Sequence, residues 1–230
     1  LYRAALKKAR VVFFENEGNA QAFIDRKVLP RKKITVLPGA GITLEQYPLM
    51  PYPQNDRVHF LYLGRIMKEK GMDELFSAEG RLHREGIPFI LDLVGFYEDG
   101  YKEQVEELEA LGICKYHGFQ SDPRPYYAAA DCVVLPSYHE GMSNVLLEGA
   151  AAGRPLITSN IPGCREAVEE NVTGFLCPAR DEETLYQAMK RMIHTSAADR
   201  AAMGIAGREK MHRQFDKAAV VANTIHAIFK

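Results

Sequence analysis

Two glutamates eight positions apart, Glu140 and Glu148, stand in the stretch whose residue types best suit chemistry. Residues 137–153 read SYHEGMSNVLLEGAAAG and follow a β-branched run that ends at Pro136. The pattern predicts a strand, a loop containing glycine, and then a helix. The free amides and the positive dipole end of such a helix attract anions. Two carboxylates at this point are consistent with an acid/base pair or with binding of hydroxyl groups.

The loop between the two glutamates suits close approach of a ligand to the main chain. Gly141 has no side chain to obstruct a ligand, and Met142, Ser143 and Asn144 would bring main-chain amides to the helix start. Ser143 or Asn144 would also cap the helix. The simpler alternative is an ordinary capped helix without a ligand.

The two carboxylates suit different partners. Glu148 would project from the first helical turn and could accept hydrogen bonds from two vicinal hydroxyls, as acidic residues do from a ribose. Its alternative role is to stabilise the helix N-terminus through the dipole. Glu140 lies beside groups that attract phosphate, which a carboxylate repels, so it is better suited to sugar hydroxyls.

A basic loop is predicted at the end of an earlier strand, in the sequence LGRIMKEKG. Gly64 permits a sharp exit from the strand, and Arg65 and Lys70 would lie at the strand tip and at the entrance to the next helix. Two cations there suit a diphosphate, because arginine binds oxygens bidentately and lysine acts as a point charge. Such a loop on its own is also typical of a solvated surface.

The elements that must position these residues alternate along the chain. Strands that alternate with helices of this length predict an α/β fold, a Rossmann-like doubly wound parallel sheet with a helical C-terminal tail. Strands are expected at residues 58–63, 89–94, 113–117, 131–136, 156–159 and 174–176. Helices are expected at residues 71–85, 100–111, 122–130, 144–152, 163–169, 181–194, 197–215 and 217–229.

Three segments are predicted from composition. Residues 1–38 read as a basic helix (1–10), a strand (11–14), a helix (16–26) and a strand (34–37), a piece too small to bury its own faces. Residues 39–57 are rich in proline and glycine and read as a linker. Residues 58–230 form the predicted Rossmann-like domain.

Composition excludes several classes of protein. The chain has 230 residues, 47% of them hydrophobic, and its 29 basic and 30 acidic residues give a net charge of -1 without a run of like charges. Neither a nucleic-acid stripe nor a polybasic membrane anchor is evident. The apolar runs are shorter than the ~20 residues of a membrane span. Four widely spaced cysteines read as free thiols of a cytoplasmic protein, and no Asp-x-Asp ends a strand to bind a metal.

The ordered set of motifs resembles the retaining glycosyltransferases of family 4, whose GT-B fold has two Rossmann-like domains. The resemblance runs from about Val11 to the end of the chain. The matching residues are Gly64-Arg65 with Lys70-Gly71; Gly118 with Tyr126-Tyr127 and Ala130-Asp131; Leu135-Pro136-Ser137 with Glu140-Gly141; Leu147-Glu148-Gly149-Ala150; Gly153-Arg154-Pro155-Leu156-Ile157; Gly163 with Glu166; and Gly174-Phe175.

The resemblance implies roles for these residues. Arg65 and Lys70 would hold the diphosphate of a nucleotide sugar, Glu148 the ribose and Glu140 the transferred sugar. The amides of residues 141–144 would bind sugar and phosphate. The nucleobase would lie beside the loops after the second and third strands, where Tyr97 or Phe119 is the candidate for stacking.

The implied function is retaining hexosyl transfer from a nucleotide-diphosphate sugar, with a UDP-sugar favoured, to a glycan or a lipid-linked acceptor. Neither a metal nor another cofactor is expected, and the parent enzyme would act in the cytoplasm or at the inner membrane face. The sequence departs from the family in lacking most of an acceptor-binding domain, so we expect residues 1–38 to be its remnant and the chain to be inactive alone. The alternatives are a non-catalytic module that binds nucleotide sugars and another GT-B enzyme, such as a nucleotide-sugar epimerase.

Overall fold

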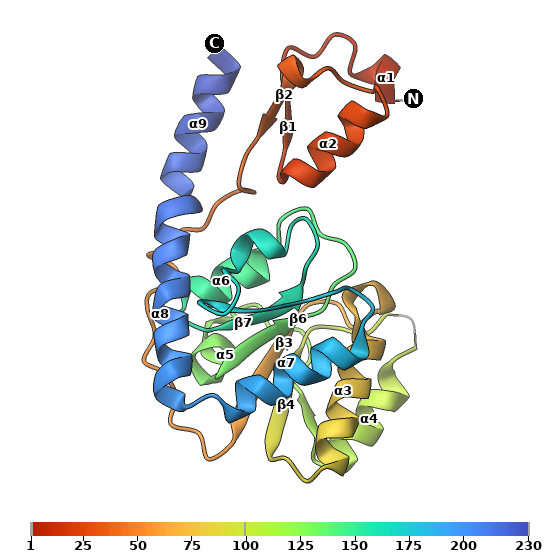
Figure 1. Ribbon diagram of the computed structural model, residues 1–230, viewed down its shortest axis with the longest axis vertical. Helices are drawn as coiled ribbons and strands as arrows, with labels where there is room; N and C mark the ends of the chain where they lie inside the picture. Colours follow the sequence, from red (N-terminus) through yellow and green to blue (C-terminus); the bar gives the residue numbers. More distant parts are fainter. Residues whose placement is uncertain (1, 99, 230) are drawn as a thin grey trace.

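A six-stranded parallel sheet forms the larger part of the molecule (Figure 1). The computed structural model describes residues 2–98 and 100–229. The order in the sheet is β5-β4-β3-β6-β7-β8. The strands are β3 (Val58–Leu63), β4 (Phe89–Val94), β5 (Cys114–Tyr116), β6 (Cys132–Leu135), β7 (Leu156–Ser159) and β8 (Gly174–Cys177). The predicted α/β class with a parallel sheet is confirmed.

The strand order reverses direction between β3 and β6. The chain runs outward from β3 through β4 to β5 and then returns to place β6 beside β3, with Phe60 opposite Cys132 and Leu61 opposite Val133. Every residue of β6 and β7 is buried, as expected for parallel strands covered on both faces. In sheets of this kind the reversal opens a crevice at the carboxyl ends of the two neighbouring strands.

Helices cover both faces of the sheet. Right-handed crossovers place α3 (Met72–Arg84) and α4 (Lys102–Ala110) on one face and α6 (Asn144–Ala151) on the other. α7 (Glu182–His194) packs against α3, and α8 (Ala197–Gln214) packs against α6 (Figure 1). The short α5 (Arg124–Ala129) precedes β6, and α9 (Lys217–Phe229) continues beyond α8 toward the N-terminal residues.

Residues 2–36 form a small unit at one end of the molecule, the N-terminal unit (Figure 1). It contains α1 (Tyr2–Ala5), β1 (Val12–Phe14), α2 (Glu17–Asp25), a 3-10 turn (Arg31–Lys33) and β2 (Ile34–Val36), with the two strands parallel. Among its described residues, the hydrophobic cluster contains three buried side chains, those of Ala20, Leu29 and Ile34. The unit therefore has little core of its own.

The predicted linker packs along the large domain. Ile42 donates from its amide to the carbonyl of Phe215 at 2.7 Å and is buried in the main core. Arg154, whose side chain is fully buried, donates to the carbonyl of Pro51 at 2.7 Å. These contacts fix the path of the chain between the N-terminal unit and β3.

Two helix predictions are wrong. The helix expected at residues 163–169 is a single 3-10 turn, Arg165–Ala167, which ends because Val168 is already extended. The Glu166 carboxylate accepts from the amide of Gly163 at 2.8 Å in this turn. The helix expected at residues 1–10 ends at Ala5, since several cations follow without an acidic partner in the next turn. Leu1 lies outside the described residues.

Candidate functional site

The loops that leave β3 and β6 meet at the point where the strand order reverses. Gly71 has φ 76°, and a Cβ atom on it would overlap the carbonyl of Pro136, so the loop of residues 64–71 can lie directly against the loop of residues 136–143. Gly64 has φ 151° and donates to the carbonyl of Val94. The two glycine positions thus bring the predicted basic loop and the predicted acidic loop together.

Lys70 and Glu140 form an ion pair across these two loops. The distance between Lys70 Nζ and Glu140 Oε1 is 2.5 Å, and the Ser137 hydroxyl donates to the same oxygen at 2.8 Å. The two charged side chains are only 19% and 14% exposed. The sequence predicted Lys70 on phosphate and Glu140 on a sugar, and here each neutralises the other at the mouth of the crevice.

Arg65 lies at the tip of β3 and pairs with a glutamate that the sequence did not single out. Its guanidinium donates to both oxygens of Glu98 at 3.2 and 3.3 Å, and this pair is much more exposed than that of Lys70. The buried Tyr62 donates to the carbonyl of Arg65 at 2.5 Å. Burial raises the pKa of Tyr62, the Glu140 charge raises it further, and Arg65 opposes the shift. Arg65 and Glu140 are therefore both close to one tyrosine beneath the crevice.

The start of α6 presents free main-chain amides beside this pair. Ser143 is the cap, since its hydroxyl accepts from the amide of Leu146, while its own amide donates to the carbonyl of Gly163 at 2.9 Å. The amides of Met142, Asn144 and Val145 have no protein acceptor within residues 2–98 and 100–229. Of the amides predicted to bind a ligand, that of Ser143 is thus already engaged. Free amides at a helix start form a ready anion site.

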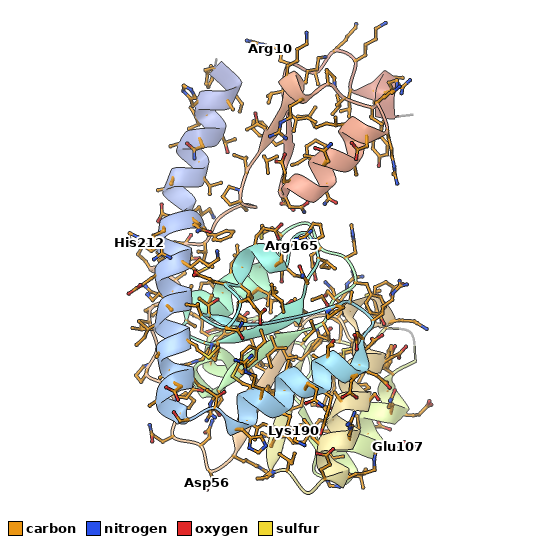
Figure 2. The ribbon with its side chains drawn as sticks, viewed as in Figure 1. Arg10, Asp56, Glu107, Arg165, Lys190 and His212 are labelled. Carbon is orange, nitrogen blue, oxygen red and sulfur yellow. The ribbon has the colours of Figure 1, made fainter. Side chains whose placement is uncertain are left out.

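The turn that follows β7 packs against the loop of residues 136–143. A Cβ atom on Gly163 would lie 2.5 Å from the carbonyl oxygen of Gly141 and 2.7 Å from that of Glu140. Arg165, in the same turn, lies at the end of the large domain that faces the N-terminal unit (Figure 2). The sequence pattern of Gly163 with Glu166 thus marks a structural support.

Glu148 faces α5 and the linker. The Tyr127 hydroxyl donates to its carboxylate at 3.0 Å. Burial raises the pKa of Glu148, and the side chains of Tyr127 and Tyr47 oppose the shift. Tyr47 and Tyr127 pack edge to face with ring centroids 6.0 Å apart. The sequence analysis missed Tyr47, whose only signal was an aromatic residue beside a proline in the linker.

The two aromatic residues predicted to stack on a nucleobase have different surroundings. Tyr97 packs against Tyr116 with centroids 4.4 Å apart, whereas Phe119 is 70% exposed. Both follow strands that end at the same edge of the sheet as β3. Gly95 donates to the carbonyl of Gly118 at 2.9 Å, which links the loops that carry these aromatics.

The described part of the chain offers little support for metal or thiol chemistry. No group of three or more His, Cys, Asp or Glu side chains there is arranged to hold a metal ion. The four cysteines are free and buried, and burial raises the pKa of Cys164 to about 12, so it is a poor nucleophile. Helices long and apolar enough to cross a membrane were not found among these residues.

Comparison with known proteins identifies relatives of this chain. The glycosyl transferases group 1 model matches residues 57–195, more than half of the chain. Glycogen synthase of Mycobacterium tuberculosis is 33% identical over 198 residues, which cover 84% of this chain and 47% of the relative. The chain thus spans about half the length of that relative.

Solved structures match the fold closely. Sucrose-phosphate synthase of Thermosynechococcus elongatus superposes with a TM-score of 0.78 and 26% identity, over 99% of this chain and 60% of the other. Anabaena Alr3699/HepE in complex with UDP gives a TM-score of 0.81 at 20% identity, over 98% of this chain and 67% of the other. The latter likeness shows the fold alone.

The family match spans both loops of the crevice. Residues 57–195 include Arg65, Lys70, Glu140 and Glu148 together with every strand of the large sheet. The strand order and the solved relatives give the Rossmann-like architecture of GT-B proteins. The chain belongs to the glycosyl transferases group 1 family.

Proposed function

We propose that the crevice between β3 and β6 binds the diphosphate of a nucleotide sugar, with a UDP-sugar favoured, for transfer of the sugar with retention of configuration. The observation that carries this proposal is the largely buried Lys70–Glu140 pair beside the amides of Met142, Asn144 and Val145, which have no acceptor among the described residues. An ammonium group and free amides suit phosphate, while a carboxylate between them suits sugar hydroxyls.

Charge development on the leaving group explains how this arrangement would assist transfer. Negative charge grows on the diphosphate as the glycosidic bond breaks, and Arg65, Lys70 and the amides of α6 are oriented before the reaction begins. Preorganised donors stabilise the transition state without further reorganisation. These groups supply the positive charge that a metal would otherwise provide. We therefore propose that donor binding is independent of added metal. Titration of the donor with and without EDTA checks this proposal.

Glu148 is proposed to read the ribose of the donor. Its carboxylate already accepts from the Tyr127 hydroxyl and lies one helical turn from the free amides. Tyr97 and Phe119 are the proposed neighbours of the base. The acceptor is proposed to be a glycan, as the glycogen synthase relative suggests, or a lipid-linked sugar. The protein is proposed to act on the cytoplasmic side.

Calorimetric titration of the 230-residue chain with UDP, GDP and ADP tests this proposal. We expect saturable binding that favours UDP, and absence of binding to all three would refute it. A second candidate function is binding without turnover, which the mutual neutralisation of Lys70 and Glu140 favours. An assay of sugar transfer and donor hydrolysis distinguishes the two, because a binding module leaves the bound UDP-sugar intact.

A further inference from the structure

The N-terminal unit reaches into the crevice at the turn between β1 and α2. The amide group of Asn16 donates from Nδ2 to the carbonyl oxygen of Gly141 at 2.6 Å. The oxygen of the same side chain accepts from the amide of Asn19 at 2.7 Å and so caps α2. Asn16 is only 2% exposed, although the unit has few other buried residues. One side chain therefore joins the start of α2 to the loop at the start of α6.

The N-terminal unit approaches the main chain of Gly141 closely. Gly141 does not have a positive φ, so backbone strain does not require glycine there. A Cβ atom on it would instead overlap the carboxylate of Glu15, the neighbour of Asn16. A Cβ on Gly39 would similarly meet the Met142 side chain at 2.6 Å. The loop at the start of α6 thus packs closely against Glu15 of the N-terminal unit and against Gly39 in the segment that follows the unit.

The hydrogen bond from Asn16 has a consequence for the neighbouring amide. The carbonyl of Gly141 and the N–H of Met142 belong to one planar trans peptide and point in opposite directions. Holding the carbonyl therefore fixes the direction of the Met142 N–H, which is one of the amides without a protein acceptor. Without the bond, this peptide is free to rotate and the partly buried carbonyl is left without that donor.

We propose that Asn16 is a positioning residue for the anion-binding loop at the start of α6. It acts through the peptide that joins Gly141 and Met142, and it makes the affinity of the crevice depend on docking of the N-terminal unit. The inference rests on the proposed function only in assigning a phosphate or sugar oxygen to the Met142 amide.

The variant Asn16→Ser tests the inference. Serine retains a side-chain acceptor for the α2 cap but has no group that reaches Gly141. We expect the affinity for UDP to fall about tenfold, as for loss of one buried hydrogen bond, while the affinity for uridine stays unchanged. Amide exchange of residues 138–146 should become faster. Gln21→Ala, on the exposed face of α2, is the matched control and should alter neither measurement.

Two results would overturn the inference. One is unchanged exchange of residues 138–146 in Asn16→Ser while α2 remains protected. The other is an equal loss of affinity for UDP and uridine, which indicates a general structural defect. If the unaltered chain binds no UDP, the proposed function fails, and the exchange measurement alone decides whether Asn16 orders the loop.

Discussion

Each cation of the crevice already has a carboxylate partner, so a diphosphate must exchange with protein groups. Lys70 is paired with Glu140 in a largely buried position, and Arg65 with Glu98 in a more exposed one. Electrostatic interactions are stronger where solvent is excluded. The Lys70 site is therefore expected to contribute more to phosphate binding than the Arg65 site.

Lys70→Ala is expected to weaken UDP binding by about 1.5–3 kcal/mol, or roughly 10- to 100-fold, since a charge-assisted hydrogen bond is lost. The free carboxylate of Glu140 would then repel the phosphate, so the effect should exceed that of Arg65→Ala. Lys68→Ala is the control, because Lys68 is 66% exposed and pairs with Asp73. Calorimetric titration measures all three, and equal affinities of the Lys70 and Lys68 variants would contradict the assignment.

Glu98→Gln is expected to strengthen UDP binding, because it removes the carboxylate that competes for Arg65. Exposed ion pairs contribute about 0.2–1 kcal/mol, which sets the gain at roughly two- to fivefold. The gain should shrink at high salt, where the competing pair is screened. Glu103→Gln on the exposed side of α4 should leave the affinity unchanged, and a loss of affinity in Glu98→Gln would show that Glu98 assists the ligand.

The residues named from sequence were those whose position depends on local signals. Arg65, Lys70, Glu140 and Glu148 follow a strand end or open a helix, and the structure brings the first three to one mouth. Their partners could not be predicted, because Glu98 and Asn16 lie 33 and 125 positions from the groups that they contact. Such pairings follow from the order of strands and from docking of separate units, which no local pattern encodes.

At the scale of elements, the turn after β7 fixes the position of the loop before α6. Gly163→Ala would place a methyl group against the carbonyls of Glu140 and Gly141 and adopt a φ of 90° that alanine disfavours. We expect it to reduce UDP affinity as well as stability. Gly86→Ala is the matched control, since φ is 69° but no atom lies within 4 Å of the added methyl. It should lose about 1–2 kcal/mol of stability and no affinity, and the same loss of affinity in both variants would exclude the steric mechanism.

Glu79 on α3 conflicts with its surroundings. It is fully buried, neither carboxylate oxygen has a partner among the described residues, and burial raises its pKa well above 4.5. Burial raises the pKa of the Cys114 thiol on β5, and the charge of Glu79 raises it further. A carboxyl group with a raised pKa contributes fully to stability below pH 4.5, and this contribution is lost as the pH rises through the folded-state pKa.

Glu79→Met should therefore stabilise the protein increasingly as the pH is raised from 5 to 9. The expected gain at the upper end is about 1–3 kcal/mol, the cost of an unsatisfied buried polar group. Urea unfolding at several pH values measures it. Glu107→Met on the exposed face of α4 (Figure 2) is the control and should show no such trend. A gain for Glu79→Met that is the same at every pH would show that folding does not raise the pKa of Glu79 above its unfolded-state value.

The regular alternation of strands and helices made most elements predictable, with bounds within two residues for the main sheet. The prediction failed at residues 163–169, where the backbone is already extended at Val168 and the segment ends after a single 3-10 turn. The sequence predicted a doubly wound sheet but did not predict the order of its strands. The actual neighbours of β3 depend on crossovers between segments that are more than 30 residues apart.

At the scale of the whole molecule, the large domain and the N-terminal unit differ greatly in the size of the hydrophobic core that stabilises each of them. The large domain has a continuous core that includes every strand of its sheet, whereas the described part of the N-terminal unit has a two-stranded sheet and four buried residues, Asn16, Ala20, Leu29 and Ile34. Residues 1–38 also carry nine Lys and Arg residues against three Asp and Glu, so like charges repel within a small volume. Docking through Asn16 is one of the few contacts that oppose opening of this unit.

The amides of β1 and β2 are therefore expected to exchange with solvent by local opening, at least about tenfold faster than those of β3 and β6 after correction for intrinsic rates. Exchange from the large sheet requires global unfolding, because its strands are buried on both faces, and regions with few buried contacts open at lower free energy. Hydrogen exchange at increasing low concentrations of urea distinguishes the two routes: β1 and β2 should show little dependence on urea, and β3 and β6 a strong one. Equal protection and equal urea dependence in all four strands would mean that the N-terminal unit and the large domain unfold as one cooperative body, and that the Asn16 contact is part of a much larger interface.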